Sequence, residues 1–182
     1  MKTSGMTDVL PLTKKQKVAC NIVMGCMLVI AGVILVLAGC GVINASVKRI
    51  AAPTVLFGIG SAILFSAMIA KNSLSMWIAG IVLTCAVPSL LAAVSAAGYG
   101  VTFPIYIAAP GIGCVFAIWF SEVKFAHIKT ILFFGVLAAI FSLASTGVCG
   151  WGLTSGILAA FIGVCVIAYA VGSYVKRDEE DA

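Results

Sequence analysis

The chain has 182 residues, of which only 9% are charged and 63% are apolar, whereas a soluble domain carries roughly 25% and 45–50%. Because this small number of charged side chains cannot cover a water-soluble surface, the composition excludes a soluble enzyme, a secreted disulfide-rich domain and a disordered chain. The class that remains is a polytopic membrane protein, which the mean hydropathy of +1.22 also indicates.

Six apolar segments are long enough to cross a hydrocarbon core of about 30 Å, which takes about 20 helical residues. Open sheet edges are excluded from lipid and the segments lack the alternation of barrel strands, so we expect an all-α fold. Short links at 44–49, 71–73, 98–102, 122–124 and 146–150 make neighbouring helices antiparallel. A polar arm (1–17) precedes the helices and a charged tail (176–182) follows them. The helices are predicted at 18–43, 50–70, 74–97, 103–121, 125–145 and 151–175.

Basic residues are unevenly divided between the two sides that these helices define. The side with both termini carries nine of them, and the opposite side carries only Lys48 and Arg49. Because cytoplasmic segments are enriched in Lys and Arg, both termini are predicted to be cytoplasmic. A nucleic-acid partner would require a basic domain, which the chain lacks. The nine residues are Lys2, Lys14, Lys15, Lys17, Lys71, Lys124, Lys129, Lys176 and Arg177.

Glycine spacing indicates an internal repeat. Gly25, Gly80 and Gly135 are 55 residues apart each time and lie in the odd-numbered helices. The alternative is coincidence, since glycine is frequent in membrane helices. The repeat predicts three helical hairpins, at about 18–70, 74–121 and 125–175, related by a pseudo-threefold axis along the membrane normal.

The even-numbered helices align less tightly. Their shared segments are Gly58-Ile-Gly60, Gly111-Ile-Gly113 and Phe161-Ile-Gly163. We expect Pro53 and Pro104 to open the first two of these helices, while the third has no such proline.

The hairpin pattern resembles a known family. Three hairpins in about 180 residues, a glycine near the start of each odd helix and the segment Met76-Trp-Ile-Ala-Gly80 are similar to the HdeD family of small bacterial inner-membrane proteins. The resemblance extends from Val18 to Val175 and depends on no polar motif. It implies a bacterial inner-membrane protein associated with acid or envelope stress, and it supplies no catalytic residues.

No Asp, Glu, Lys or Arg lies in the middle of a predicted helix. Ionisable residues within the membrane mark proton relays, ion paths and coupled carriers, so their absence argues against these functions. With neither an acid–base pair nor metal-ligand spacing, we expect no catalytic residue, metal or cofactor. The single histidine, His127, is predicted to be solvated near the cytoplasmic surface, where it is the candidate pH-sensing residue.

The seven cysteines show no C-x-x-C spacing and are expected to be mostly buried free thiols. Cys40 and Cys149 would both lie near the outer surface, so a disulfide between these two residues stays an alternative. The segment Leu37-Ala-Gly-Cys40 also has the form of a lipobox. The preceding apolar run is longer than the roughly 7–15 residues of a signal peptide, which argues against cleavage there.

Two further groups of residues are singled out by their positions. Glycines seven or four residues apart give the first and last helices a smooth face for close packing, with a glycine-lined pore as the alternative. Prolines make the second hairpin the most irregular, so any cavity is expected there. The packing glycines are Gly25, Gly32, Gly39, Gly152, Gly156 and Gly163, and the cavity residues are Thr84, Pro88, Ser89, Thr102, Tyr106 and Pro110.

The sequence therefore predicts a non-enzymatic inner-membrane protein with a role in acid or envelope stress tolerance or in membrane integrity. The alternative is a small channel or transporter for an uncharged or weakly charged solute. The lipid bilayer is the predicted partner, and a second copy of the chain stays open as another. The solute of a transporter is not predicted.

Overall fold

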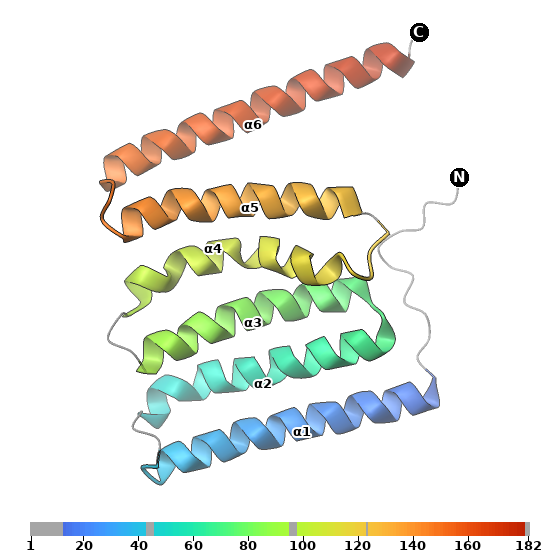
Figure 1. The fold of residues 1–182 in the computed structure, drawn as a ribbon, viewed down its shortest axis with the longest axis vertical. Helices are drawn as coiled ribbons and strands as arrows, with labels where there is room; N and C mark the ends of the chain where they lie inside the picture. The colour runs from blue at the N-terminus through green and yellow to red at the C-terminus, as the bar shows by residue number, and fades with distance from the viewer. Residues whose placement is uncertain (1–12, 43–45, 95–97, 123, 181–182) are drawn as a thin grey trace. The chain divides into compact units, whose positions relative to one another are not determined.

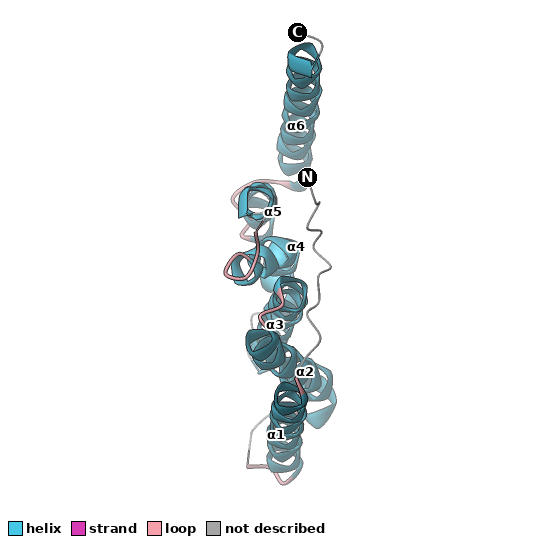
Figure 2. Cartoon of the chain, turned by 90° about the vertical axis from the view of Figure 1, so that its right-hand side faces the viewer, coloured by secondary structure: helices cyan, strands magenta, loops and turns pink. Residues whose placement is uncertain are grey.

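The computed structural model describes residues 13–42, 46–94, 98–122 and 124–180, and it describes no side chains at 94, 98–99 and 172–180. Its regular elements over these residues are all α-helices (Figure 2). Each helix is long and apolar enough to cross a membrane, which confirms the predicted six spans and the all-α class. The helices are α1 (Lys14–Gly39), α2 (Val47–Ala70), α3 (Ser73–Val94), α4 (Gly98–Ala117), α5 (Lys124–Ser145) and α6 (Trp151–Glu180).

The even-numbered helices α2 and α4 begin earlier than the sequence predicted. Pro53 and Pro104 lie inside these helices rather than at their first turns. The prediction that these prolines open the helices was wrong, because proline's fixed φ fits a helix and only one backbone bond is lost at each. Residues 98–102, predicted as a link, form the first residues of α4, and α6 continues through the start of the charged tail to Glu180.

The chain divides into two compact units, Met1–Ala138 and Ala139–Ala182, with the boundary inside α5. In the first unit, α1 packs on α2, α2 on α3 and α3 on α4. Between the described residues of this unit, α1 makes no backbone contact with α3, nor does α2 with α4. These four helices therefore form a single row in which successive helices run in opposite directions (Figure 1). The threefold relation among hairpins stays a prediction.

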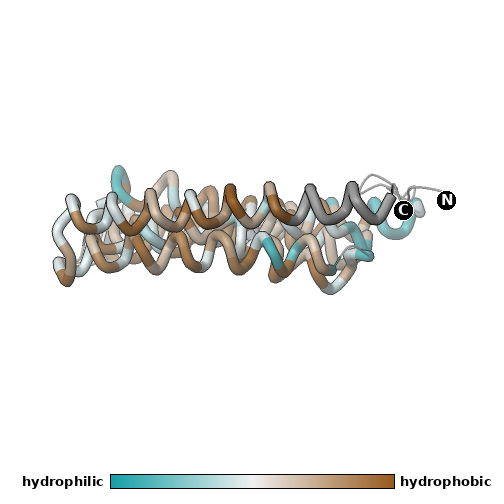
Figure 3. Tube along the Cα trace, turned by 90° about the horizontal axis from the view of Figure 1, so that it is seen from above, coloured by the Kyte–Doolittle hydropathy of each residue, from teal (hydrophilic) through white to brown (hydrophobic). Residues whose placement is uncertain are grey.

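Small residues fill the contacts of this row. Alanines of α2, α3 and α4 such as Ala62, Ala79 and Ala117 are almost completely buried, whereas Leu91 and Val115 point outward. In Figure 3 the brown colour of hydrophobic residues extends along the helices. Without a hydrophobic driving force between helices in lipid, small side chains favour association by letting backbones approach closely. The burial pattern is therefore the one expected of membrane helices.

Two glycines of α2 lie at its contacts with the neighbouring helices, on opposite sides of α2. A β-carbon on Gly58 would lie 3.1 Å from the Cβ of Ala31 in α1, and one on Gly60 would lie 3.0 Å from Leu83 Cγ in α3. Residues two apart in a helix point about 200° apart, since each residue turns by about 100°. The Gly-Ile-Gly segment therefore lets both neighbouring helices approach α2.

Helix α4 uses its Gly-Ile-Gly segment in the same way. Gly113 faces α3, and a β-carbon on Gly111 would lie 3.1 Å from the Cβ of Phe134 in α5. The order is reversed relative to α2, because the first glycine of this segment faces the following helix. The two segments that aligned in the sequence therefore both let neighbouring helices approach. The glycine that faces the preceding helix comes first in α2 and second in α4.

Candidate functional site in the second helical hairpin

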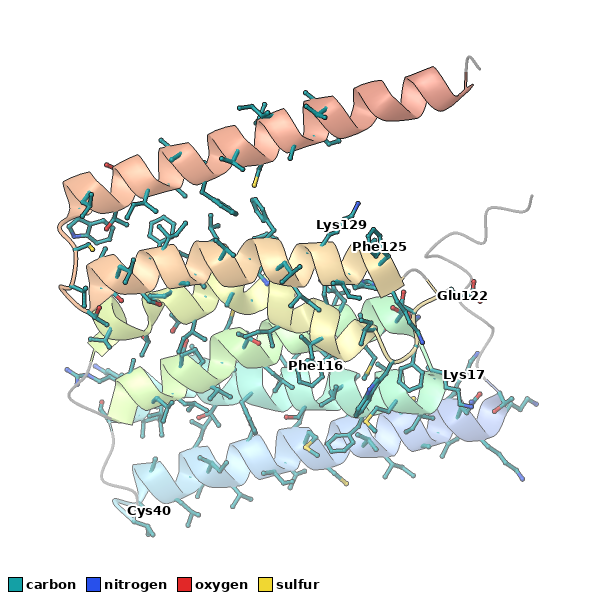
Figure 4. All side chains as sticks on the ribbon, turned by 45° about the horizontal axis from the view of Figure 1, so that its top comes forward. Lys17, Cys40, Phe116, Glu122, Phe125 and Lys129 are labelled. Atoms are coloured by element: carbon teal, nitrogen blue, oxygen red, sulfur yellow. The ribbon has the colours of Figure 1, made fainter. Side chains whose placement is uncertain are left out.

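The second hairpin, α3 and α4, contains the closest approach at any described glycine. A β-carbon on Gly80 would lie 2.7 Å from the Cα of Gly113, and one on Gly113 would lie 2.7 Å from the carbonyl oxygen of Trp77. Phe116, labelled in Figure 4, also lies against Gly80, with its ring 2.9 Å from that β-carbon position. Both positions exclude any larger residue unless the backbones move apart.

Next to this contact, an indole joins the two helices. The Nε1–H of Trp77 donates a hydrogen bond of 3.2 Å to the carbonyl oxygen of Pro110. An indole N–H within a membrane needs an acceptor, because lipid tails supply none. This bond therefore fixes α3 against the proline-containing part of α4.

A second polar contact joins the helices further along. The hydroxyl oxygens of Ser89 and Tyr106 lie 2.8 Å apart. Ser89 donates its own proton to the carbonyl oxygen of Cys85 over 2.7 Å, so the Tyr106 hydroxyl is the donor to Ser89. Thr84 bonds within its own helix, to the carbonyl oxygen of Gly80 at 2.7 Å.

The six predicted cavity residues are thus only partly brought together. Ser89 and Tyr106 meet across the two helices, and Pro110 receives the indole bond. Pro88 is buried and Thr102 is half-buried, on α3 and α4 respectively. Sequence reasoning missed Trp77 and Gly113 as packing residues, although a tryptophan three residues before a glycine was already visible in the resemblance. The Trp77 indole and the Tyr106 hydroxyl therefore join the two helices, whereas the Thr84 hydroxyl bonds within α3.

The glycine face predicted on α1 does not form the α1–α2 contact. Nothing lies within 4 Å of a β-carbon placed on Gly25 or Gly32, and on Gly39 the nearest atom is Val47 Cγ2 at 4.0 Å. The buried side of α1 instead contains Ala31 and Ala38. Alanine methyl groups fill the interhelical space that a glycine face would leave empty.

In the second unit, the predicted packing glycines of α6 are also exposed. No atom lies within 4 Å of a β-carbon on these residues, and their packing role stays a prediction. Thr154 of this helix is buried and bonds to the carbonyl oxygen of Gly150 at 3.2 Å. The exposed glycines are Gly152, Gly156 and Gly163.

His127 is buried, which contradicts the prediction that it is solvated. Only 5% of the residue is exposed, and Nε2 lies 2.8 Å from the hydroxyl of Ser121. The cause is its place on α5: it precedes Ile131 by four residues and Phe134 by seven, so all three share the face that packs on α4 at Gly111. Its role as a pH sensor stays a prediction.

All seven cysteines are free thiols in the structure. Cys114 is buried between helices, whereas Cys26 lies exposed on the outer face of α1 within its apolar span. Cys40 is exposed after α1, and Cys149 lies half-buried in the second unit. The two belong to different units, and their pairing stays a prediction.

Comparison with protein-family models, curated proteins and solved structures finds no match to this chain. The family resemblance of the hairpin pattern therefore stays a prediction. Among the residues that the structure describes, no three His, Cys, Asp or Glu side chains are grouped closely enough to hold a metal ion.

Proposed function

We propose that this chain is a non-enzymatic integral membrane protein, similar to the HdeD family, that supports tolerance of acid or envelope stress or the integrity of the membrane. The observation that supports this proposal is the use of polar groups in the second hairpin. Trp77, Ser89 and Tyr106 form hydrogen bonds between α3 and α4, in the hairpin that also contains the close contact of Gly80 and Gly113. Polar groups committed in this way stabilise a packed unit and are not free to bind a passing solute.

We also propose a bacterial inner-membrane location with both termini in the cytoplasm. The support is the division of basic residues, nine on one side against Lys48 and Arg49 on the other. Three hairpins in parallel orientation are part of this proposal, because each two-helix unit returns to the side from which it started.

Transport of an uncharged or weakly charged solute is the second candidate, favoured by a different observation. Pro88, Pro104 and Pro110 all lie inside α3 and α4. Each lacks an N–H, so one backbone carbonyl per proline loses its helical donor at membrane depth. Irregular backbone of this kind is tolerated where it is buried in protein or lines a water-filled path.

The test is solute flux into sealed vesicles that contain the purified protein. The panel comprises protons, urea, ammonia and short-chain acids, and protein-free vesicles give the background. Our proposal expects no flux above background, together with higher survival of an acid-challenged bacterial host that expresses the protein. Gly80→Leu should abolish that protection, and Gly25→Leu should retain it. Saturable flux of one solute would instead establish transport, and equal survival with and without the protein would refute the stress role.

A further inference from the structure

The end of the first unit where α1, α3 and α5 begin is joined from helix to helix by hydrogen bonds. The side-chain amide of Gln16 donates to the carbonyl oxygen of Ile69 at 3.2 Å, which joins the start of α1 to the end of α2. The hydroxyl of Ser73 donates to the carbonyl oxygen of Ala117 at 3.2 Å, which joins the start of α3 to the end of α4. The turn between α2 and α3 therefore has a hydrogen bond to α1 just before it and a hydrogen bond to α4 just after it.

Four exposed lysines gather at the α1–α2 part of this end. Lys14, Lys15 and Lys17 stand in the first turn of α1, and the bond of Gln16 holds this turn next to the end of α2. Lys15 and Lys17 flank Gln16 at about 100° on either side, whereas Lys14 lies on the face of α1 turned away from α2. Lys71 follows α2 directly. We call these four residues the lysine cluster; Figure 4 labels Lys17 at the start of α1.

The position of the cluster raises the local positive potential. A helix N-terminus carries a partial positive charge, so lysines in a first turn are less favourable there than carboxylates. The first turn of α1 nevertheless contains three lysines and no acidic residue. Among the side chains that the structure describes, Glu122 is the only carboxylate, and it lies on the turn before α5. The described chain itself thus offers the cluster little compensating charge.

Lys71 occupies a backbone position that favours glycine. Helices α1 and α5 are followed by Gly41 and Gly147 with φ of 77° and 74°, whereas α2 is followed by Lys71 with φ of 51°. Lys71 and Asn72 donate backbone bonds to the carbonyl oxygens of Met68 and Ala67, which closes the same kind of helix end. In a left-handed conformation a β-carbon comes too close to the backbone carbonyl oxygen, so residues other than glycine are strained there. A lysine at this turn therefore carries a backbone cost that glycine would not.

The lysines also stand at the boundary of the apolar spans. The apolar run of α1 begins at Val18, directly after Lys17, and that of α2 ends at Ala70, directly before Lys71. At the same end of the first unit, Trp119 is 79% exposed and the ammonium of Lys129 lies 4.7 Å from the ring centre of Phe125. Exposed aromatic side chains at span ends mark the depth of lipid headgroups. For spans that end at these boundaries, we therefore expect the ammonium groups at the level of phospholipid phosphates.

We propose that the lysine cluster binds the phosphate headgroup of an anionic phospholipid in the adjacent leaflet. The α1 lysines and Lys71 supply the positive charge, and the Gln16–Ile69 bond keeps the two groups together. Each lysine near an anionic surface contributes about 1 kcal/mol, equivalent to about fivefold in affinity.

The test uses the purified, delipidated full chain in detergent with equal amounts of phosphatidylglycerol and phosphatidylcholine, and native mass spectrometry counts the bound lipids. We expect preferential retention of phosphatidylglycerol. Lys71→Gly keeps the turn and removes the ammonium, so it should weaken phosphatidylglycerol retention about fivefold without lowering the melting temperature. Lys15→Gln with Lys17→Gln should weaken it further.

The matched control is Lys48→Gln with Arg49→Gln, which removes two exposed charges from the opposite end of α2 and should leave phosphatidylglycerol retention within twofold. Glycerol phosphate at millimolar concentration should not displace the lipid, since the headgroup is bound together with its acyl chains. Equal retention of both lipids, an equal loss in the control variant, or full displacement by glycerol phosphate would each overturn the proposal.

Discussion

Gly80 and Gly113 face each other across α3 and α4 so closely that a β-carbon on Gly80 would lie 2.7 Å from the Cα of its partner. Atoms at this separation overlap strongly, so the contact exists only because both residues lack a side chain. The indole bond from Trp77 to Pro110 lies beside it. Close packing and a directed hydrogen bond therefore reinforce one another in the same part of the hairpin.

Replacing Gly80 with alanine is expected to force α3 and α4 apart. Overpacking of this kind costs about 1–3 kcal/mol, and Gly113→Ala should cost a similar amount because its β-carbon would meet the backbone of Trp77. The measurement is the melting temperature in detergent, which should fall for both variants. Gly25→Ala is the matched control, since nothing lies within 4 Å of its β-carbon position. A fall as large in the control as in the Gly80 variant would contradict the close contact.

The bond between Tyr106 and Ser89 is expected to contribute measurably to stability. Hydrogen bonds between membrane helices average about 0.6 kcal/mol and reach about 1.7 kcal/mol. A double-mutant cycle with Tyr106→Phe and Ser89→Ala, followed by unfolding in mixed micelles, should give a coupling energy in that range. Tyr169→Phe is a suitable control because Tyr169 is 81% exposed. A coupling energy of zero would show that the two hydroxyls do not interact.

Helix number and type were predictable because apolar length alone determines whether a segment crosses lipid. The sequence also indicated that the Gly-Ile-Gly segments of α2 and α4 were related. It did not indicate which neighbour each glycine faces, since that depends on how the helices are placed around one another. Gly58 faces the preceding helix, while Gly111 faces the following one.

Helix ends and the environment of single polar residues were harder to predict. Pro53 suggested a helix start, yet α2 begins six residues earlier because one missing bond does not end a helix. His127 suggested a solvated residue because lysines flank it, but its place on the α5 face that meets α4 buries it. The flanking lysines thus place His127 near a helix end, whereas its burial depends on the rotation of α5 against α4.

The burial of His127 predicts slow chemical modification. Diethyl pyrocarbonate should modify the folded protein in mild detergent at least tenfold more slowly than the protein unfolded in dodecyl sulfate. The chain contains one histidine, so the imidazole absorbance change reports this residue alone. Ser121→Ala removes the hydroxyl that lies 2.8 Å from Nε2 and should raise the rate in the folded state. Equal rates in the folded and unfolded protein would contradict the burial.

The division of basic residues predicts the location of the C-terminus. A green fluorescent protein fused after residue 182 should fluoresce in a bacterial host, because it folds in the cytoplasm, whereas an alkaline phosphatase fusion at the same site should be inactive. The reason is the excess of Lys and Arg on the side that holds both termini. Active phosphatase with a dark fluorescent fusion would reverse the proposed orientation.

The last prediction is that no side chain in the middle of a span carries a proton across the membrane. A charge at the bilayer centre costs at least about 2.5–3.5 kcal/mol and is retained mainly where it is used. In this sequence the central parts of the six spans contain no Asp, Glu, Lys, Arg or His, and His127 lies in the first turn of α5. The hydroxyl of Tyr106 in α4 already donates to Ser89.

Sealed vesicles containing the protein should therefore show no proton current above that of protein-free vesicles when a pH gradient of two units is imposed. A pH-sensitive dye enclosed in the vesicles measures the current, and a protonophore added at the end confirms that the vesicles are sealed. Because the hydroxyl of Tyr106 is bonded, Tyr106→Phe should leave the baseline unchanged. A current that this substitution abolishes would show that the second hairpin conducts protons, and the packing role proposed for its polar groups would then have to be given up.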